Sequence, residues 1–206
     1  MSKKIKVLFA TTNEGKLKEV KEIAREEDFE IIGLSEVGLG KVTVMEDGKT
    51  FLENARKKAI EFSLKVHLPV VADDSGLEID ALNGEPGVHS ARYLGETLSF
   101  EDKCKIILKK MGNTSDNLRT ARFICFACYA REGNIIHCAK GVLEGKISTS
   151  LKGNNGFGYD PIFYYPPFKK TLAQMELEEK NRISHRTEAF KQLFFTIKRY
   201  NKKFNT

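Results

Sequence analysis

The sequence predicts an α/β protein whose central mixed β-sheet is split over two lobes. In the first half of the 206-residue chain, apolar strand-like runs alternate with segments of helical spacing, which is typical of a sheet flanked by helices. In the second half, long stretches of alternating apolar and polar residues follow one another and indicate antiparallel hairpins. With 41% hydrophobic residues, the chain can bury a large core. We therefore expect a single domain, residues 1–206, made of two lobes.

The first predicted elements are a strand over residues 5–10 and a helix after it, with a polar loop between them. The helix is predicted because Leu17, Val20 and Ile23 recur at helical spacing. Backbone amides at the helix start, a glycine and a lysine make the loop a candidate phosphate site. The Walker A spacing is absent, and many α/β proteins begin with such a loop and bind nothing there. The loop consists of Thr11, Thr12, Asn13, Glu14, Gly15 and Lys16.

A second strand, over residues 30–34, precedes a looser stretch and a second helix. Residues 50–53, Thr-Phe-Leu-Glu, have the pattern of a capping box that starts this helix, and Pro69 closes it. Glu46 lies in the looser stretch, where chain order makes it the acid best placed to approach a pair of aspartates further on. An ordinary surface carboxylate is the equally weighted alternative for Glu46.

Two adjacent aspartates, Asp73 and Asp74, follow a buried strand at residues 69–72. We expect the strand to break there, because two carboxylates followed by Ser75 and a glycine are typical of a turn. Neighbouring carboxylates repel each other, and burying either one without a partner is costly. A cation between them, or a shared substrate proton, would make the pair tolerable, and α/β sheets bind ligands at strand ends. Taken alone, the segment fits a solvated turn better.

The second half of the chain predicts long antiparallel strands. Residues 119–131 and 135–142 alternate strongly, and Gly133-Asn134 is expected to turn the chain between them. A further strand that ends at Ile147 is expected after a turn at residues 144–146. The sheet would thus gain its antiparallel part here.

All four cysteines are expected to be reduced thiols, since nothing in the sequence indicates a secreted protein. Cys125 and Cys128 form a C-x-x-C, but an offset of three residues places them on opposite faces of a strand. No second pair or nearby histidine completes a zinc site. Core packing is therefore the preferred interpretation. The cysteines are Cys104, Cys125, Cys128 and Cys138.

Two later segments have an unusual composition. Residues 154–163 combine glycines and an Asp-Pro with aromatic rings. The rings can stack on a base, or the segment can be a turn packed on the core. Taken alone, the segment favours the packed turn. Lys180, His185 and Arg186 gather around the predicted start of the last helix, where Ser184 is a natural N-cap. Such a basic group is suited to bind an anion or a nucleobase.

The net charge and the hydropathy limit the class of protein. Residues 169–206 hold ten Lys/Arg against four Asp/Glu and so carry the whole formal charge of +6. A basic end suits a polyanionic ligand, either a nucleoside triphosphate or a nucleic acid. No apolar run approaches the length of a membrane span, and the N-terminus leads into a strand rather than a signal sequence. We expect a cytoplasmic protein without a membrane partner.

Six short motifs occur in a fixed order along the chain. They are T-x-N-x-x-K (residues 11–16), F-x-E-N-A (51–55), A-D-D-S-G-L (72–77), P-G-V-x-S-A-R-Y (86–93), G-F-G-Y-D-P-I-F (156–163) and I-S-H-R (183–186). Each motif is weak alone, but all six in register are very specific. Through them the chain, from about Val7 to the final helix, closely resembles the inosine triphosphate pyrophosphatase family.

The resemblance implies a fold and an activity. The fold is a two-lobed α/β structure with an elongated mixed β-sheet flanked by helices and the active-site cleft between the lobes. The activity is Mg²⁺-dependent hydrolysis of non-canonical purine nucleoside triphosphates (ITP, dITP and XTP) between the α- and β-phosphates. The products are the nucleoside monophosphate and pyrophosphate, so the enzyme cleanses the nucleotide pool. A homodimer is implied, and no nucleic acid is expected as a partner.

The resemblance also implies a role for each matching residue. The loop of residues 11–16 would bind the triphosphate, with Lys16 neutralising the leaving pyrophosphate. Asp74 would bind Mg²⁺ and accept the proton of the attacking water, and Asp73 would adjust its charge. Ser75 would donate a hydrogen bond to the substrate. The base would be framed by Phe157, Gly158, Tyr159 and Asp160, with Lys180, His185 and Arg186 completing its pocket.

One position departs from the family pattern. Many relatives carry an acidic pair before the glycine at position 48, whereas here Met45 takes the first place, which leaves Glu46 as the candidate second metal ligand. Two other functions remain open. A nucleic-acid-binding protein would use the basic end and the aromatic loop but would not explain the carboxylate pair, and a different nucleotide hydrolase could act on modified pyrimidines.

Overall fold

The computed structural model describes residues 4–204, and the chain divides into two compact units. Unit 1 comprises Met1–Asp74, Cys125–Gly141 and His185–Thr206, and unit 2 comprises Ser75–Ile124 and Val142–Ser184. Each unit is therefore assembled from separate stretches of the sequence.

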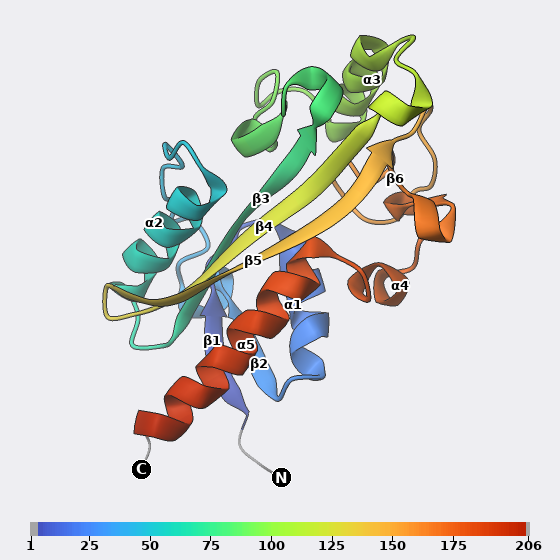
Figure 1. Cartoon of the computed structure of the whole chain (residues 1–206). Helices are drawn as coiled ribbons and strands as arrows, with labels where there is room; N and C mark the ends of the chain where they lie inside the picture. Colours follow the sequence, from blue (N-terminus) through green and yellow to red (C-terminus); the bar gives the residue numbers. More distant parts are fainter. Residues whose placement is uncertain (1–3, 205–206) are drawn as a thin grey trace. The chain divides into compact units, whose positions relative to one another are not determined.

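Within the described residues, seven strands form one sheet in the order β2-β1-β3-β4-β5-β6-β7 (Figure 1). β1 (Ile5–Phe9) is parallel to both β2 (Phe29–Gly33) and β3 (Val70–Ile79). β5 (Asn134–Ile147) is antiparallel to β6 (Phe163–Tyr165). The predicted mixed sheet is thus confirmed.

Apart from short 3₁₀ helices, the remaining elements of the described residues are two strands and five α-helices. The strands are β4 (Thr120–Arg131) and β7 (Lys170–Thr171). The helices are α1 (Glu14–Arg25), α2 (Phe51–Ser63), α3 (Phe100–Met111), α4 (Leu177–Asn181) and α5 (His185–Phe204).

The core of unit 1 has two layers because side chains alternate across a strand. Val7 and Phe9 of β1 pack in a cluster with α1 and α5, and the ring of Phe9 meets that of Phe190 edge-on at 5.2 Å between centroids. Leu8, between them, packs in a second cluster that includes Ala55 and other residues of α2. Helices therefore cover both faces of this part of the sheet. A further cluster, built around Leu77 and the apolar face of α3, forms the core of unit 2.

β3 runs without interruption through the double aspartate, so the predicted break after Ala72 is wrong. Asp73 is completely buried in the strand, and Asp74 is 6% exposed. A strand accommodates two carboxylates when each finds a partner, and both do here, as described below.

The predicted hairpin is present, but its turn is one residue earlier than expected. Glu132 and Gly133, with φ of 51° and 78°, form the two-residue left-handed turn between β4 and β5. The turn expected at residues 144–146 is absent, because β5 continues to Ile147. Gly145 instead allows the close approach of β6: a Cβ there would lie 2.6 Å from ring atoms of Phe163.

Cys128 and Cys138 form a disulfide between β4 and β5, so the expectation of four reduced thiols is wrong. Their Cα atoms are 4.1 Å apart, somewhat less than the roughly 4.5 Å of a non-hydrogen-bonded pair in antiparallel strands. Cys104 and Cys125 are free and buried. Cys125 belongs to the cluster facing α1 and α5 and Cys128 to the one facing α2, so their predicted placement on opposite faces is confirmed.

The start of α2 follows half of the predicted capping box. Thr50 is the N-cap, and its hydroxyl accepts a hydrogen bond from the Glu53 amide at 3.2 Å. The Glu53 carboxylate accepts from the amide of Lys49, one residue before the position that a capping box requires, at 2.7 Å.

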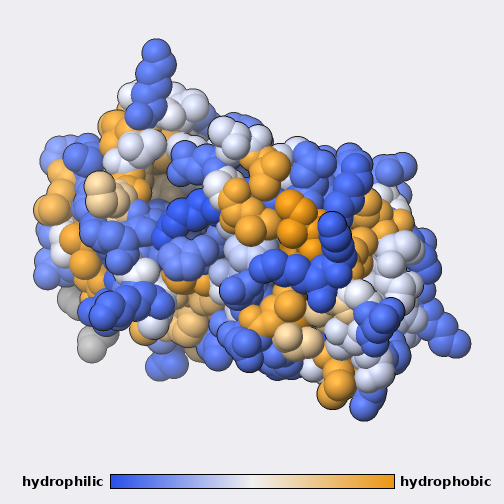
Figure 2. All heavy atoms as spheres, turned by 90° about the horizontal axis from the view of Figure 1, so that it is seen from above, coloured by the Kyte–Doolittle hydropathy of each residue, from blue (hydrophilic) through white to orange (hydrophobic). Residues whose placement is uncertain are grey.

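No helix in the described part of the chain has the length and apolar character needed to cross a membrane. Figure 2 shows a face on which hydrophilic side chains predominate and apolar side chains gather in places. The large apolar side chains exposed on the protein include Met45, Leu64, Leu118 and Phe195.

Candidate active site

Asp73 is held in unit 1 by two cations from distant parts of the chain. The ammonium of Lys16, from the first turn of α1, lies 3.3 Å from Oδ1 and 3.2 Å from Oδ2 of Asp73. The guanidinium of Arg186, from the first turn of α5, donates to Oδ2 at 3.3 Å. Burial alone would raise the pKa of Asp73, but the positive charges of Lys16 and Arg186 hold the pKa well below its usual range. Asp73 is therefore a permanent anion.

Arg186 is fully buried and has a second carboxylate partner, Glu19. Glu19 is itself buried on α1, one turn after the loop of residues 11–16. Burial would lower the pKa of Arg186, but Glu19 and Asp73 together raise it. Two carboxylates and two cations (Lys16, Arg186) thus form a balanced buried network beneath the loop.

Asp74 has partners other than those of Asp73. Its Oδ2 accepts a hydrogen bond of 2.9 Å from the side-chain amide of Asn54 on α2. Burial raises the pKa of Asp74, the charges of Lys58 and Lys16 oppose this, and Glu46 adds to the increase. A carboxylate with a raised pKa next to cations is suited to accept a proton.

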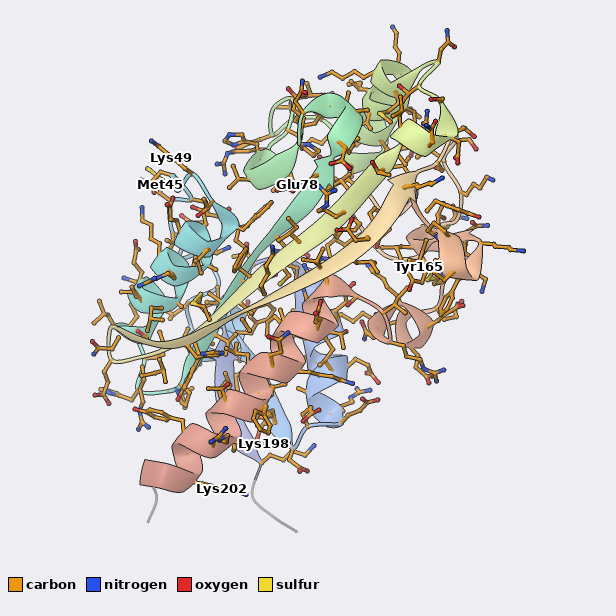
Figure 3. The ribbon with its side chains drawn as sticks, in the orientation of Figure 1. Met45, Lys49, Glu78, Tyr165, Lys198 and Lys202 are labelled. Atoms are coloured by element: carbon orange, nitrogen blue, oxygen red, sulfur yellow. A yellow bond between two sulfur atoms is a disulfide. The ribbon has the colours of Figure 1, made fainter. Side chains whose placement is uncertain are left out.

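Lys58, one turn after Asn54 on α2, links Asp74 to Glu46. Its ammonium donates to a carboxylate oxygen of Glu46, and its side chain is 12% exposed. Burial would lower the pKa of Lys58, but Asp74, Glu46 and Asp73 raise it, so the ammonium stays charged. Figure 3 shows Met45, beside Glu46, and Lys49 on the loop that leads into α2.

The loop between β1 and α1 is organised by its own side chains. The side-chain Oδ1 of Asn13 accepts from the backbone amide of Lys16 at 3.0 Å and caps α1, while the backbone amide of Asn13 donates to the Thr11 hydroxyl at 3.1 Å. Thr12, Asn13 and Glu14 are exposed. The amides of a helix N-terminus are thus presented to solvent beside Lys16, which favours an anion.

Unit 2 holds the aromatic loop, and Asp160 is at its centre. The buried Asp160 carboxylate accepts from the Phe157 amide at 2.9 Å and from the ammonium of Lys180. The same ammonium lies 4.8 Å from the centroid of the Phe157 ring. Gly156 has φ of +74°, and a Cβ on it would lie 2.1 Å from Asp160, so only glycine fits the bend. Tyr159 is buried, with its hydroxyl donating to the carbonyl of Ser90 at 2.7 Å.

Comparisons with known proteins show the family of this chain. The model of the Ham1 family matches residues 7–195. The chain belongs to the Ham1 family. A protein of Desulfotalea psychrophila named dITP/XTP pyrophosphatase is 44% identical over 187 residues, which are 91% of this chain and 82% of the relative. One of the same name from Desulforamulus reducens is 42% identical over 195 residues, 95% of this chain and 96% of the relative.

Solved structures of Ham1 proteins share the fold. The Staphylococcus aureus Ham1 protein superposes with a TM-score of 0.81 at 41% identity, covering 94% of this chain and 98% of that one. A Ham1 protein of Coxiella burnetii gives a TM-score of 0.83 at 37% identity, with 95% and 99% covered. The resemblance drawn from the six motifs is confirmed, as is the α/β fold with a mixed sheet.

The predicted site residues of this Ham1 chain belong to both units. Unit 1 contains the loop of residues 11–16, Glu46, Asp73, Asp74, His185 and Arg186, and unit 2 contains Ser75, Phe157, Gly158, Tyr159, Asp160 and Lys180. The predicted basic group is divided, since Lys180 pairs with Asp160 and Arg186 with Asp73 and Glu19. Lys180 and Arg186 therefore have different carboxylate partners.

Three residues of unit 1 that sequence reasoning did not assign to the site are Glu19, Asn54 and Lys58. The signal for Lys58 was its position one helical turn after Asn54, on the same side of α2. The signal for Glu19 was weaker: it is a charged residue in the apolar stripe of α1. Such a residue indicates a buried ion pair only when the partner of the pair is known.

Asp74 and Glu46 fit a magnesium ion chemically. Proteins bind Mg²⁺ through one or two carboxylates, with phosphate oxygens and waters completing the shell. Both carboxylates act on the ammonium of Lys58, so they already gather around one positive charge. Among the described residues, no group of three or more His, Cys, Asp or Glu side chains could hold a metal.

Proposed function

We propose that this protein is a nucleoside-triphosphate pyrophosphatase that hydrolyses ITP, dITP and XTP to the monophosphate and pyrophosphate. The observation that carries the proposal is the buried carboxylate of Asp74, on which the charges of Lys58 and Lys16 act, with Lys16 in the first turn of α1. Relatives that are 42% and 44% identical over nearly the whole chain bear the name dITP/XTP pyrophosphatase. The motifs of that activity are all present in this sequence.

In the proposed reaction, water attacks the α-phosphorus and the bond to the oxygen that bridges the α- and β-phosphates breaks. Asp74 accepts the proton of the water, and its raised pKa favours this role. Charge develops on the leaving pyrophosphate, where Lys16 and the amides of the 11–16 loop stabilise it. Asp73, kept anionic by its buried partners, fixes the position of Lys16.

Asp74 and Glu46 would hold Mg²⁺, which supplies positive charge to the phosphate oxygens when bound. Lys58 keeps Glu46 oriented and neutralises part of the local negative charge. The dependence on magnesium is part of the proposal, and removal of the ion by EDTA should abolish pyrophosphate release.

The base would bind to Phe157, Gly158, Tyr159 and Asp160, with Lys180, His185 and Arg186 contributing. Donor groups at the purine 6-position favour a keto oxygen over the amino group of adenine, which would leave them unpaired. The Lys180 ammonium, above the Phe157 ring, is such a donor. Ser75 would donate a hydrogen bond to the substrate.

We also propose that the two units form one domain and that the protein is a cytoplasmic homodimer, as the family resemblance implies. Light scattering coupled to gel filtration would report a mass of about twice the 23.3 kDa of one chain. A mass of one chain would contradict the dimer.

The function is tested by incubating the purified protein and Mg²⁺ with a panel of triphosphates. We expect rapid release of pyrophosphate from ITP, dITP and XTP and little from ATP. Orthophosphate as the first product, or preference for modified pyrimidines, would indicate a different hydrolase. Binding of RNA without turnover would indicate a nucleic-acid-binding protein.

A further inference from the structure

The side-chain amide of Asn54, in unit 1, makes a hydrogen bond through its oxygen and another through its nitrogen. The residue is 1% exposed in the first turn of α2. Its Oδ1 accepts a hydrogen bond of 2.8 Å from the backbone amide of Gly48, and its Nδ2 donates one of 2.9 Å to Oδ2 of Asp74. The amide orientation is fixed by chemistry, because an oxygen must face the N–H of Gly48 and a donor must face the carboxylate.

The loop before α2 approaches Asn54 closely because residue 48 is glycine. A Cβ at Gly48 would lie 2.6 Å from Asn54 Oδ1 and 2.9 Å from the Cβ of Glu53. Any side chain at this position would therefore displace the amide oxygen of Asn54 or the loop itself.

The same loop carries Glu46, and α2 anchors it at a second point. Lys58, one turn beyond Asn54, donates to Glu46, so two side chains on one side of the helix hold the loop. Asn54 also donates a hydrogen bond to Asp74. One amide thus fixes the loop that carries Glu46 and the carboxylate of Asp74 together.

We propose that Asn54 is a positioning residue for Asp74. The torsion about Cβ–Cγ of an aspartate is soft, so an unrestrained carboxylate samples many orientations. The hydrogen bond from Asn54 Nδ2 selects one orientation of Asp74, and the hydrogen bond from Gly48 prevents the amide from turning away. The inference rests on the proposed function, in which Asp74 accepts the proton of the attacking water.

Asn54→Asp separates the two contacts. The new carboxylate still accepts from the Gly48 amide, but in its ionised form it cannot donate to Asp74 and repels that carboxylate instead. We expect kcat for dITP to fall about 10- to 100-fold, the usual effect of removing a hydrogen bond to a functional carboxylate, while KM stays within about threefold. Gly48→Ala should lower kcat in the same way because it displaces the amide oxygen. Arg56→Ala, on the exposed face of α2, is the matched control and should leave both constants unchanged.

A second readout does not depend on activity. In a crystal structure of Asn54→Asp we expect the Asp74 carboxylate to be rotated or to occupy two orientations, while thermal denaturation shows a folded protein. Full kcat in a folded Asn54→Asp protein, or an unchanged Asp74 torsion, would overturn the inference and leave the proposed function intact. A wild-type protein that releases no pyrophosphate from dITP would overturn both.

Discussion

At the scale of single residues, the buried charges of unit 1 depend on one another. Arg186 is the shared partner of Asp73 and Glu19, and all three side chains are at most 2% exposed. Ions lose their hydration when they are buried, and only the partner compensates for the loss. The network is therefore sensitive to the removal of any member.

Arg186→Met leaves Glu19 and Asp73 buried without their common cation. We expect the free energy of unfolding to fall by about 3–5 kcal/mol, the usual cost of breaking a buried ion pair. Urea denaturation measures the change. Arg182→Met, whose guanidinium is exposed beside Glu178, is the control and should change stability by about 0.5 kcal/mol at most. A loss below about 1 kcal/mol for Arg186→Met would contradict the structural role.

Asp74→Asn removes the proposed proton acceptor and should abolish pyrophosphate release from dITP. The fold should survive, because burial already favours the neutral form of this side chain and the amide is of similar size. Turnover and a thermal melt of the same sample test both parts. Retained turnover would exclude Asp74 from the reaction.

Lys16→Ala should weaken the binding of an uncleaved triphosphate analogue more than the binding of the monophosphate. The reason is that Lys16 acts on the β- and γ-phosphates in the proposed complex, while its loss from Asp73 affects both ligands alike. Isothermal titration calorimetry with both ligands measures the difference. Equal losses would contradict the assignment of the phosphate loop.

At the scale of elements, Gly141 decides how α5 meets the sheet in unit 1. A Cβ on this residue of β5 would lie 2.0 Å from the carbonyl oxygen of His185 and 2.8 Å from the amide nitrogen of Ala189. These atoms belong to the first turns of α5, so the helix rests directly on the strand backbone. Arg186 thereby comes within reach of Asp73.

Gly141→Ala should destabilise the protein by about 3 kcal/mol or more, because the methyl group meets backbone atoms that cannot move independently. Chemical denaturation would show the effect. Lys140→Ala, an exposed neighbour on the same strand, should change stability by about 0.5 kcal/mol at most. Equal stability of the two variants would contradict the close approach of α5.

The β4–β5 hairpin yields a prediction for thiol counting. A thiol reagent should detect no cysteine in the native protein, two after unfolding without reductant, and four after unfolding with reductant, because Cys104 and Cys125 are buried and the other pair is oxidised. Burial raises the pKa of Cys104 to about 12, which further suppresses its reaction. Four reactive thiols in the unfolded, unreduced protein would show that the disulfide does not form.

At the scale of the whole molecule, patterns along the chain predicted the elements and the mixed sheet. The continuity of β3 and the disulfide depend on contacts between residues that are apart in the sequence, and these were not predicted. The break expected in β3 is absent because Asp73 pairs with two cations that are distant in the sequence. Lys16 precedes it by 57 residues, and Arg186 follows it by 113 residues. The disulfide was missed because it depends on the pairing register of the hairpin, which brings together Cys128 and Cys138, ten residues apart.

The parts of the candidate site that could be predicted from the sequence are those that lie in short motifs. The loop that ends at Lys16 and the double aspartate stand out in the sequence by composition alone. Asn54 lies in one of the six motifs, but its two hydrogen bonds could not be foreseen, because they require the distance between α2, the preceding loop and β3.

The discontinuous path of the chain affects how the protein is made. A ribosome synthesises β3 long before α5, so the nascent polypeptide carries Asp73 for 113 residues before its arginine is added. Lys16 is the partner already present during that interval. Unit 1 can complete its buried charges only after Arg186 has been synthesised, and a chain that stops before residue 185 should be a substrate for chaperones and proteases rather than a smaller enzyme.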